Sequence, residues 1–287
     1  MKVVVTGGGQ LAWELAQTLP ASIELVRAER SLLDITDAEG CQQLLASEHP
    51  DWLINAAAYT AVDDAESDVE GAYAVNGQGA ENLARACKLV GARMIQVSTD
   101  FVFDGQNSSP YLPNAWPNPQ GVYGASKLAG ERAVARILPE ALIVRTAWLY
   151  SVQGSNFVKS MLRLMAEKPT LGVVVDQVGS PTWARGLAQM LWAGVLRKVP
   201  GGCYHWTDGG VASWYDFAVA IQDLALELGL LDKRIPIQAI ASTAYPTPAV
   251  RPAFSVLDKS DTLATFELEN RHWRHQLAEM LDALARS

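Results

Sequence analysis

Residues 2–19, "KVVVTGGGQLAWELAQTL", constrain the fold more than any other stretch of the chain, because they read as a buried strand, a glycine turn and an amphipathic helix. Gly7, Gly9 and Ala12 fit the spacing G-x-G-x-x-A. In that setting the N–H groups at the helix start can hold a pyrophosphate, and the second glycine lets it approach closely. A tight turn without a ligand would look the same in isolation. Because further strand and helix patterns follow, the sequence predicts dinucleotide binding.

Strand and helix patterns continue to alternate as far as about residue 150. Strands are predicted at 23–28, 51–58, 93–103 and 141–150, and helices at 37–48, 69–91 and 124–138. This alternation predicts an α/β fold with a doubly wound, Rossmann-like parallel sheet. Beyond residue 150 the pattern loosens. We therefore expect a dinucleotide-binding domain over 1–150 and a smaller C-terminal α/β substrate lobe, mainly 151–287, with segments near 173–198 and 235–250 returning to the first domain.

Charge and cysteine content exclude several classes of protein. The net charge is −8 and no run is rich in lysine or arginine, which argues against nucleic acid as a partner. Three cysteines lie far apart without a C-x-x-C motif, so neither a disulfide framework nor a zinc knuckle is expected. The apolar run 187–196 is too short to span a membrane, and the start of the chain does not read as a signal peptide. We expect a cytoplasmic protein with no membrane partner.

Tyr123 and Lys127 in "GVYGASKLAGE" lie one turn apart on the same face of a predicted helix. A phenol normally titrates near pH 10, and a neighbouring ammonium stabilises the phenolate. We expect the pKa of Tyr123 to fall by about three units, roughly 4 kcal/mol, so that the phenol could exchange a proton with a carbinol oxygen. An isolated Y-x-x-x-K is more often incidental. However, Thr99 ends the fourth predicted strand at the sheet edge where ligands bind, and there it would meet the tyrosine hydroxyl. The three residues together therefore favour a proton donor over an incidental motif.

The end of the second predicted strand bears on the choice of cofactor. NAD sites usually place an acidic residue there for the ribose 2′-hydroxyl. Here Arg27 and Arg30 could instead meet a 2′-phosphate, unless both are simply solvated. The sequence therefore favours NADPH, with NADH possible. Asp34 and Ile35 lie where an adenine could pack.

Seven blocks in a fixed order resemble the extended short-chain dehydrogenase/reductase family, which acts on nucleotide sugars. Within it the chain resembles the enzymes that reduce the C4 keto group of dTDP-4-dehydro-L-rhamnose to give dTDP-L-rhamnose. The match runs nearly from end to end. The blocks are residues 55–67, 98–105, 122–131, 145–150, 176–182, 213–218 and 244–252.

The resemblance implies a role for particular side chains. Thr99, Tyr123 and Lys127 would form the catalytic triad, with Tyr123 giving a proton to the C4 oxygen. The cofactor would be lined, together with Gly7, Tyr123 and Lys127, by Gly9, Gln10, Leu11, Asp34, Ile35, Ala58, Tyr59, Thr60 and Val97. The nucleotide-sugar substrate would contact Thr99, Asp100, Trp148, Val62 and Arg251. A homodimer is possible.

The sequence also departs from the family pattern. The glycine turn "TGGGQLA" is one residue shorter than usual, and Arg185 stands where some members have a glutamate that supports a magnesium ion, so no metal is expected. Two alternatives remain. A nucleotide-sugar epimerase or dehydratase is disfavoured because Phe101, not an acid, follows Asp100. A non-catalytic regulatory subunit resembling that of methionine adenosyltransferase is disfavoured by the presence of Trp148.

Overall fold

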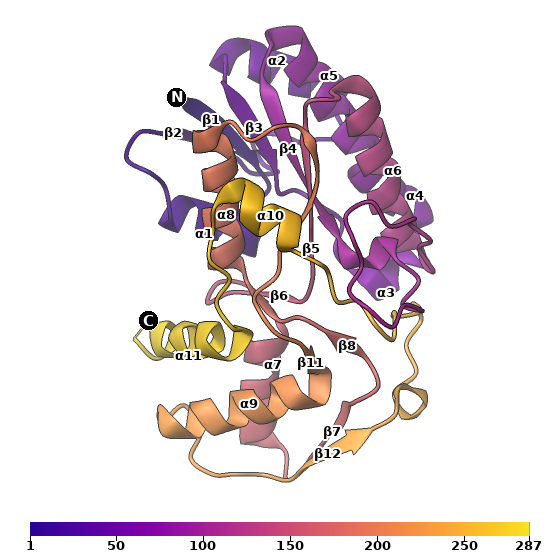
Figure 1. Cartoon of the computed structure of the whole chain (residues 1–287), viewed down its shortest axis with the longest axis vertical. Helices are drawn as coiled ribbons and strands as arrows, with labels where there is room; N and C mark the ends of the chain where they lie inside the picture. Colours follow the sequence, from indigo (N-terminus) through magenta and orange to yellow (C-terminus); the bar gives the residue numbers. More distant parts are fainter. Residues whose placement is uncertain (287) are drawn as a thin grey trace.

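A six-stranded parallel sheet forms the centre of the computed structural model, which describes residues 1–286 (Figure 1). The strand order is β10-β5-β4-β3-β1-β2, and the register is parallel throughout. The strands are β1 (Lys2–Thr6), β2 (Glu24–Ala28), β3 (Trp52–Asn55), β4 (Arg93–Thr99), β5 (Leu142–Thr146) and β10 (Gly202–His205). The predicted α/β fold class is confirmed.

Helices cover both faces of this sheet because its strands are apolar on both faces. On one face, Val3 and Val5 pack against α1 (Gln10–Gln17) and α8 (Ala184–Arg197). On the other face, Val4 packs in a cluster with residues of three helices. These helices are α2 (Ala38–Glu48), α5 (Ala80–Val90) and α6 (Val122–Ile137). The sheet is therefore doubly wound.

Two predicted elements are interrupted in the structure. The helix expected over 69–91 consists of α4 (Val69–Tyr73), a π-helical turn η1 (Ala74–Gly79) and α5. The strand expected over 141–150 stops at the end of β5 and resumes as β6 (Leu149–Tyr150). Between them Trp148 has a φ of +47°, in the left-handed region that bulky side chains rarely adopt. Both interruptions lie close to the carboxyl edge of the sheet.

The C-terminal lobe contains three helices (Figure 1). They pack around an aromatic core that includes Tyr150, Phe217 and Trp273. The helices are α7 (Phe157–Glu167), α9 (Trp214–Glu227) and α11 (Trp273–Ala285). Short strand pairs complete the lobe. They are β7 (Leu171–Val174) with β12 (Ile237–Ile240), β8 (Val178–Gly179) with β11 (Ala212–Ser213), and β6 with β9 (Thr182–Trp183).

Segments from the second half of the chain return to the main sheet. Helix α8 packs on α1, β10 is an edge strand of the main sheet, and α10 (Ser260–Phe266) packs beside them. Within 235–250, β12 hydrogen-bonds to β7 and not to the main sheet, and the return of this segment to the first domain stays a prediction. The division at residue 150 stays a prediction.

The three cysteines of residues 1–286 form no disulfide bond. Cys41 and Cys87 are buried, Cys203 is partly buried, and all three thiols are free. Burial raises the pKa of the Cys41 and Cys203 thiols to about 12. No helix of this part of the chain is both long and apolar enough to cross a membrane.

Candidate active site

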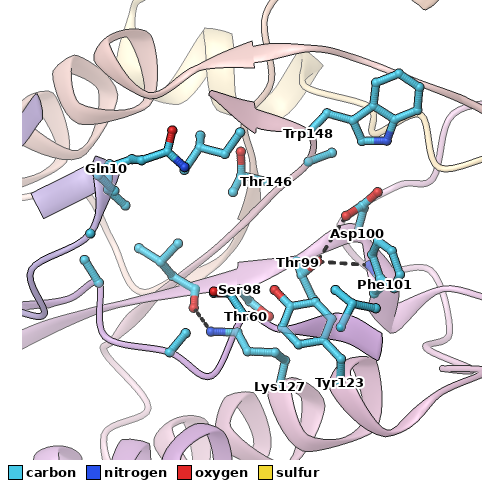
Figure 2. A pocket seen from close by; sticks show the side chains of 18 of the residues that line it. Gln10, Thr60, Ser98, Thr99, Asp100, Phe101, Tyr123, Lys127, Thr146 and Trp148 are labelled. Carbon is cyan, nitrogen blue, oxygen red and sulfur yellow. Dashed lines mark hydrogen bonds between the residues drawn. The ribbon is translucent and has the colours of Figure 1, made fainter. Parts of the chain in front are cut away.

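A cavity of about 530 Å³ opens at the carboxyl edge of the main sheet (Figure 2). Its walls come from the start of α1, the ends of β3, β4 and β5, and the first turns of α6. A second cavity of about 420 Å³ lies along the glycine turn and shares Gly9, Thr60 and residues 56–58 with the first. Because ligands of open α/β sheets bind at this edge, we treat the two as one elongated site.

The structure brings the predicted cofactor residues to these two cavities. The first is lined by Gly9, Gln10, Leu11, Ala58, Thr60, Val97, Tyr123 and Lys127. The second adds Gly7, Asp34, Ile35 and Tyr59. The predicted substrate residues Thr99, Asp100, Val62 and Trp148 also line the first cavity, whereas Arg251 lines a different one. The roles of these residues stay predictions.

The glycine turn has room for a ligand despite its shortened sequence. Gly7 has a φ of +88°, and a Cβ there would lie 2.9 Å from the Cα of Ala57, so only glycine fits. At Gly9 a Cβ would meet no atom within 4 Å. The first turn of α1 carries no acidic residue and its N-cap makes no side-chain hydrogen bond. Backbone N–H groups are therefore available to an anion.

Tyr123 and Lys127 both project from α6 into the first cavity, as Figure 2 shows. The Lys127 ammonium donates to the carbonyl oxygen of Val97 at 2.6 Å. The Tyr123 hydroxyl hydrogen-bonds to Thr99. The hydroxyl of Thr99 donates to Asp100 Oδ1 at 3.0 Å and accepts from the N–H of Phe101 at 3.2 Å. The three predicted catalytic side chains thus meet at one place.

The expected lowering of the Tyr123 pKa is not found in this structure. Burial raises the pKa of Tyr123 to about 12, and the hydrogen bond with Thr99 only partly opposes this. Burial also lowers the pKa of Lys127 to about 8. The physical reason is that desolvation disfavours both charged forms, and the ammonium is directed at the Val97 carbonyl rather than at the phenol. At neutral pH, Tyr123 therefore keeps its proton.

Asp100 is a second buried acid beside this group. It is 2% exposed, and burial raises its pKa to about 6, although hydrogen bonds from Ser255 and Thr99 favour the carboxylate. Its charge also raises the pKa of Tyr123. A carboxyl in this position can hydrogen-bond a substrate hydroxyl at the wall of the cavity.

Trp148 forms one end of the first cavity. Its indole stacks on that of Trp214, with ring centroids 3.5 Å apart and planes inclined by 6°. Trp214 in turn lines a third cavity of about 650 Å³ in the lobe. A Cβ at Gly179 would lie 2.6 Å from the Trp148 indole, so glycine is needed there for space. The stacked indoles of Trp148 and Trp214 therefore lie between the first cavity and the third cavity.

Arg251 lines the third cavity and is not next to the predicted catalytic residues. Its guanidinium donates two hydrogen bonds to Asp63, at 3.0 and 2.7 Å. The predicted contact of Arg251 with the substrate therefore needs a ligand long enough to reach from one cavity to the other.

The two arginines considered for the cofactor 2′-phosphate differ in position. Arg30 lines the second cavity and lies 3.5 Å from Asp34. Arg27 is paired with Glu29 at 2.5 Å and lines neither cavity. Arg30 is therefore better placed than Arg27 to pair with a 2′-phosphate of the cofactor.

Asn76 lines neither cavity but supports residues that do, and the sequence reasoning missed it. Its buried side chain accepts from the N–H of Tyr59 at 2.9 Å, and donates to the Tyr59 carbonyl at 3.1 Å and to Ser126 at 3.0 Å. It thereby ties the predicted cofactor loop to α6. The available signal was an asparagine within the largely apolar pattern "AYAVNGQGA".

Arg185, which stands at the position of the magnesium-supporting glutamate, and the helix-start residue His272 are both engaged in contacts within the chain. Arg185 Nε lies 3.4 Å from Oε2 of the buried Glu14. The His272 side chain accepts from the N–H of Arg274 and so caps α11. Within residues 1–286, no group of three or more His, Cys, Asp and Glu side chains is arranged to hold a metal ion.

Comparison with known proteins shows which family the chain belongs to. The model of the RmlD substrate binding domain matches residues 1–286. The chain belongs to that family. The dTDP-4-dehydrorhamnose reductase of Streptomyces griseus is 44% identical over 98% of this chain and 93% of the relative. Membership confirms the resemblance stated from the sequence blocks.

Solved structures of family members agree closely with this fold. That of the dTDP-4-dehydrorhamnose reductase from Clostridium acetobutylicum has a TM-score of 0.93 and 39% identity, and covers 99% of each chain. That of the Bacillus anthracis reductase, solved in complex with NADP, has a TM-score of 0.93 and 34% identity, and covers 98% of this chain and 99% of the other.

Proposed function

We propose that this protein is an NADPH-dependent reductase that converts dTDP-4-dehydro-L-rhamnose to dTDP-L-rhamnose. One observation carries the proposal: the Tyr123 phenol, held by Thr99, and the Lys127 ammonium face one cavity that continues along the glycine turn. The names of its relatives, and the NADP complex of one of them, support the same activity.

The open space at Gly9 and the uncapped start of α1 fit the pyrophosphate of a dinucleotide. Asp34 and Ile35 would hold the adenosine end, while Arg30 could pair with a 2′-phosphate. Ala58, Tyr59, Thr60 and Val97 would line the rest of the cofactor, and Lys127 would hydrogen-bond the nicotinamide ribose. NADH is a second possible cofactor. When bound, NADPH supplies the hydride that is added to the C4 carbon.

Tyr123 would donate its proton to the C4 oxygen as this oxygen gains negative charge. Reduction needs a protonated phenol, and the raised pKa of about 12 keeps it in that form. After transfer, the phenolate is stabilised by the positive charge of Lys127, and by the Thr99 hydroxyl once its proton turns from Asp100 Oδ1 to the phenolate oxygen. A proton from solvent then restores the phenol. This account replaces the expected acidic phenol with a neutral donor.

The substrate would extend from this proton donor towards the lobe. Thr99, Asp100 and Val62 would contact the sugar, and Trp148 would close the cavity over it. Arg251 would face the diphosphate. We also expect a cytoplasmic location, and a homodimer remains a prediction.

The test is NADPH oxidation, followed by absorbance, with a panel of 4-keto nucleotide sugars. We expect Tyr123→Phe to lower kcat by at least about 100-fold, because a general acid contributes that much, and to leave cofactor affinity within about twofold. Tyr73→Phe, at an exposed tyrosine on α4, is the matched control. Full activity in Tyr123→Phe would exclude this residue from the chemistry. A wild type that turns over no keto sugar would favour a binding subunit.

A further inference from the structure

Helix α6, which carries Tyr123 and Lys127, begins without a capping side chain of its own. Its N-cap residue is Gly121. The first N–H of the helix, that of Val122, donates instead to Oε1 of Glu66 at 2.8 Å, a residue 56 positions earlier in the chain. The first amides of a helix lack partners within it, and the N-terminus favours a negative charge. Glu66 therefore caps α6 from a separate segment.

Gly121 leaves room for this carboxylate. A Cβ at Gly121 would lie 2.7 Å from Glu66 Oε1. The backbone of Gly121 is extended, with φ −141° and ψ 169°, a conformation that other residues also adopt. Glycine at this position leaves space for the Glu66 carboxylate, and its conformational freedom is not used. A residue with a Cβ would push the carboxylate away from the helix.

The segment that carries Glu66 is itself held from the opposite side. It begins with α3 (Val62–Ala65), where Asp63 accepts from both terminal nitrogens of Arg251 and from the N–H of Ala249, the latter at 3.1 Å. Val62 of the same short helix lines the first cavity. The segment that carries Glu66 is thus hydrogen-bonded both to the start of α6 and to residues 249 and 251 of the C-terminal half.

We propose that Glu66 is a positioning residue that holds the first turn of α6, and with it the Tyr123 hydroxyl, in place for proton transfer. This inference rests on the proposed function. Tyr123 directly follows the capped residue, whereas Lys127 is anchored one turn later by the Val97 carbonyl. Loss of the cap should release the first turn and leave the second in place. Proton transfer should suffer while cofactor binding is retained, because small displacements of a reacting group are costly.

The proposal is tested with Glu66→Ala, Glu66→Gln and Gly121→Ala. We expect Glu66→Ala and Gly121→Ala to lower kcat at least about tenfold with the Kd for NADPH within about twofold. Glu66→Gln should keep kcat within about threefold of wild type, because an amide oxygen can still accept from the Val122 N–H. Asp37→Ala is the matched control, since Asp37 caps α2 through the N–H of Glu39 and lines neither site cavity.

Amide hydrogen exchange gives a readout that does not depend on turnover. Glu66→Ala should speed exchange at residues 122–125 at least about tenfold, and Asp37→Ala should not. Unchanged exchange there, or a kcat in Glu66→Ala equal to that of Asp37→Ala, would overturn the proposal. If the wild type reduces no keto sugar, the proposed function fails, while the exchange experiment still decides whether Glu66 holds the helix.

Discussion

The buried ion pair between Glu131 and Arg145 links the catalytic helix to the main sheet. Glu131 lies on α6, one turn after Lys127, and Arg145 lies on β5. Arg145 Nε donates to Glu131 Oε1 at 2.9 Å and Nη2 to Oε2 at 2.7 Å, and the two side chains are only 6% and 5% exposed. Glu131→Gln would remove the negative charge and leave the buried guanidinium without its counter-ion.

The cost follows from this geometry. Two unit charges about 4 Å apart interact by roughly 4 kcal/mol at an effective dielectric constant of 20. Breaking a buried pair by removing one partner typically costs about 3–5 kcal/mol. The glutamine oxygen can keep one hydrogen bond, so we expect a loss of about 3–4 kcal/mol. For a chain of this length, about 2 °C per kcal/mol corresponds to a fall in Tm of roughly 6–8 °C.

Thermal unfolding followed by circular dichroism measures this loss. Glu81→Gln is the control, because Glu81 pairs with the exposed Arg85 and Arg136 and its loss should cost less than about 1 kcal/mol. If Glu131→Gln lowers Tm no more than Glu81→Gln does, the reasoning is refuted. A double variant that replaces both partners by apolar side chains should recover much of the loss.

Two further predictions concern His205 and Gly124. Burial, with a smaller effect of the Arg145 charge, lowers the pKa of His205 to about 3. Between pH 6.5 and pH 3 the unfolded chain therefore binds a proton at His205 that the folded protein does not bind. As a result, the stability of the folded protein falls as the pH falls. Relative to His205→Leu, the wild type should lose about 2 kcal/mol more stability between pH 7 and pH 5, and equal pH profiles of Tm would contradict this. In Gly124→Ala the new methyl group would lie 2.1 Å from the carbonyl oxygen of Phe101 in the turn after β4. It should cost about 1–3 kcal/mol of stability and lower kcat about tenfold by moving the first turn of α6, whereas wild-type Tm and kcat would contradict the close packing.

Local patterns predicted the elements of the nucleotide domain well. Hydrophobic periodicity was enough to predict the elements at 23–28 and 37–48, because each corresponds to one uninterrupted strand or helix, β2 or α2. The interruptions at η1 and at Trp148 were missed. There the chain gives up regular structure to place Asn76 against Tyr59 and the Trp148 indole against Trp214, contacts with residues far away in the sequence. Propensity rules describe near neighbours and contain no information on such contacts.

The sequence of 235–250 did not indicate which strand β12 would pair with, for a related reason. A short strand such as β12 can add to any free edge, and only the folded lobe offers β7 as that edge. The predicted lowering of the Tyr123 pKa was wrong. Helical spacing indicates that Lys127 is near, but it does not indicate that water is excluded from both groups.

The sequence by itself determined the strand–turn–helix start, the doubly wound sheet and the placing of Tyr123 and Lys127 on one helical face, because these follow from the repeat of the backbone and the few residues that fit a glycine turn. The tertiary structure alone decided that the Lys127 ammonium is directed at the Val97 carbonyl, that Glu66 caps α6 and that the phenol stays protonated. Those features depend on which distant segments come together and how much water they exclude. Burial and long-range contact are properties of the folded chain and not of any one segment.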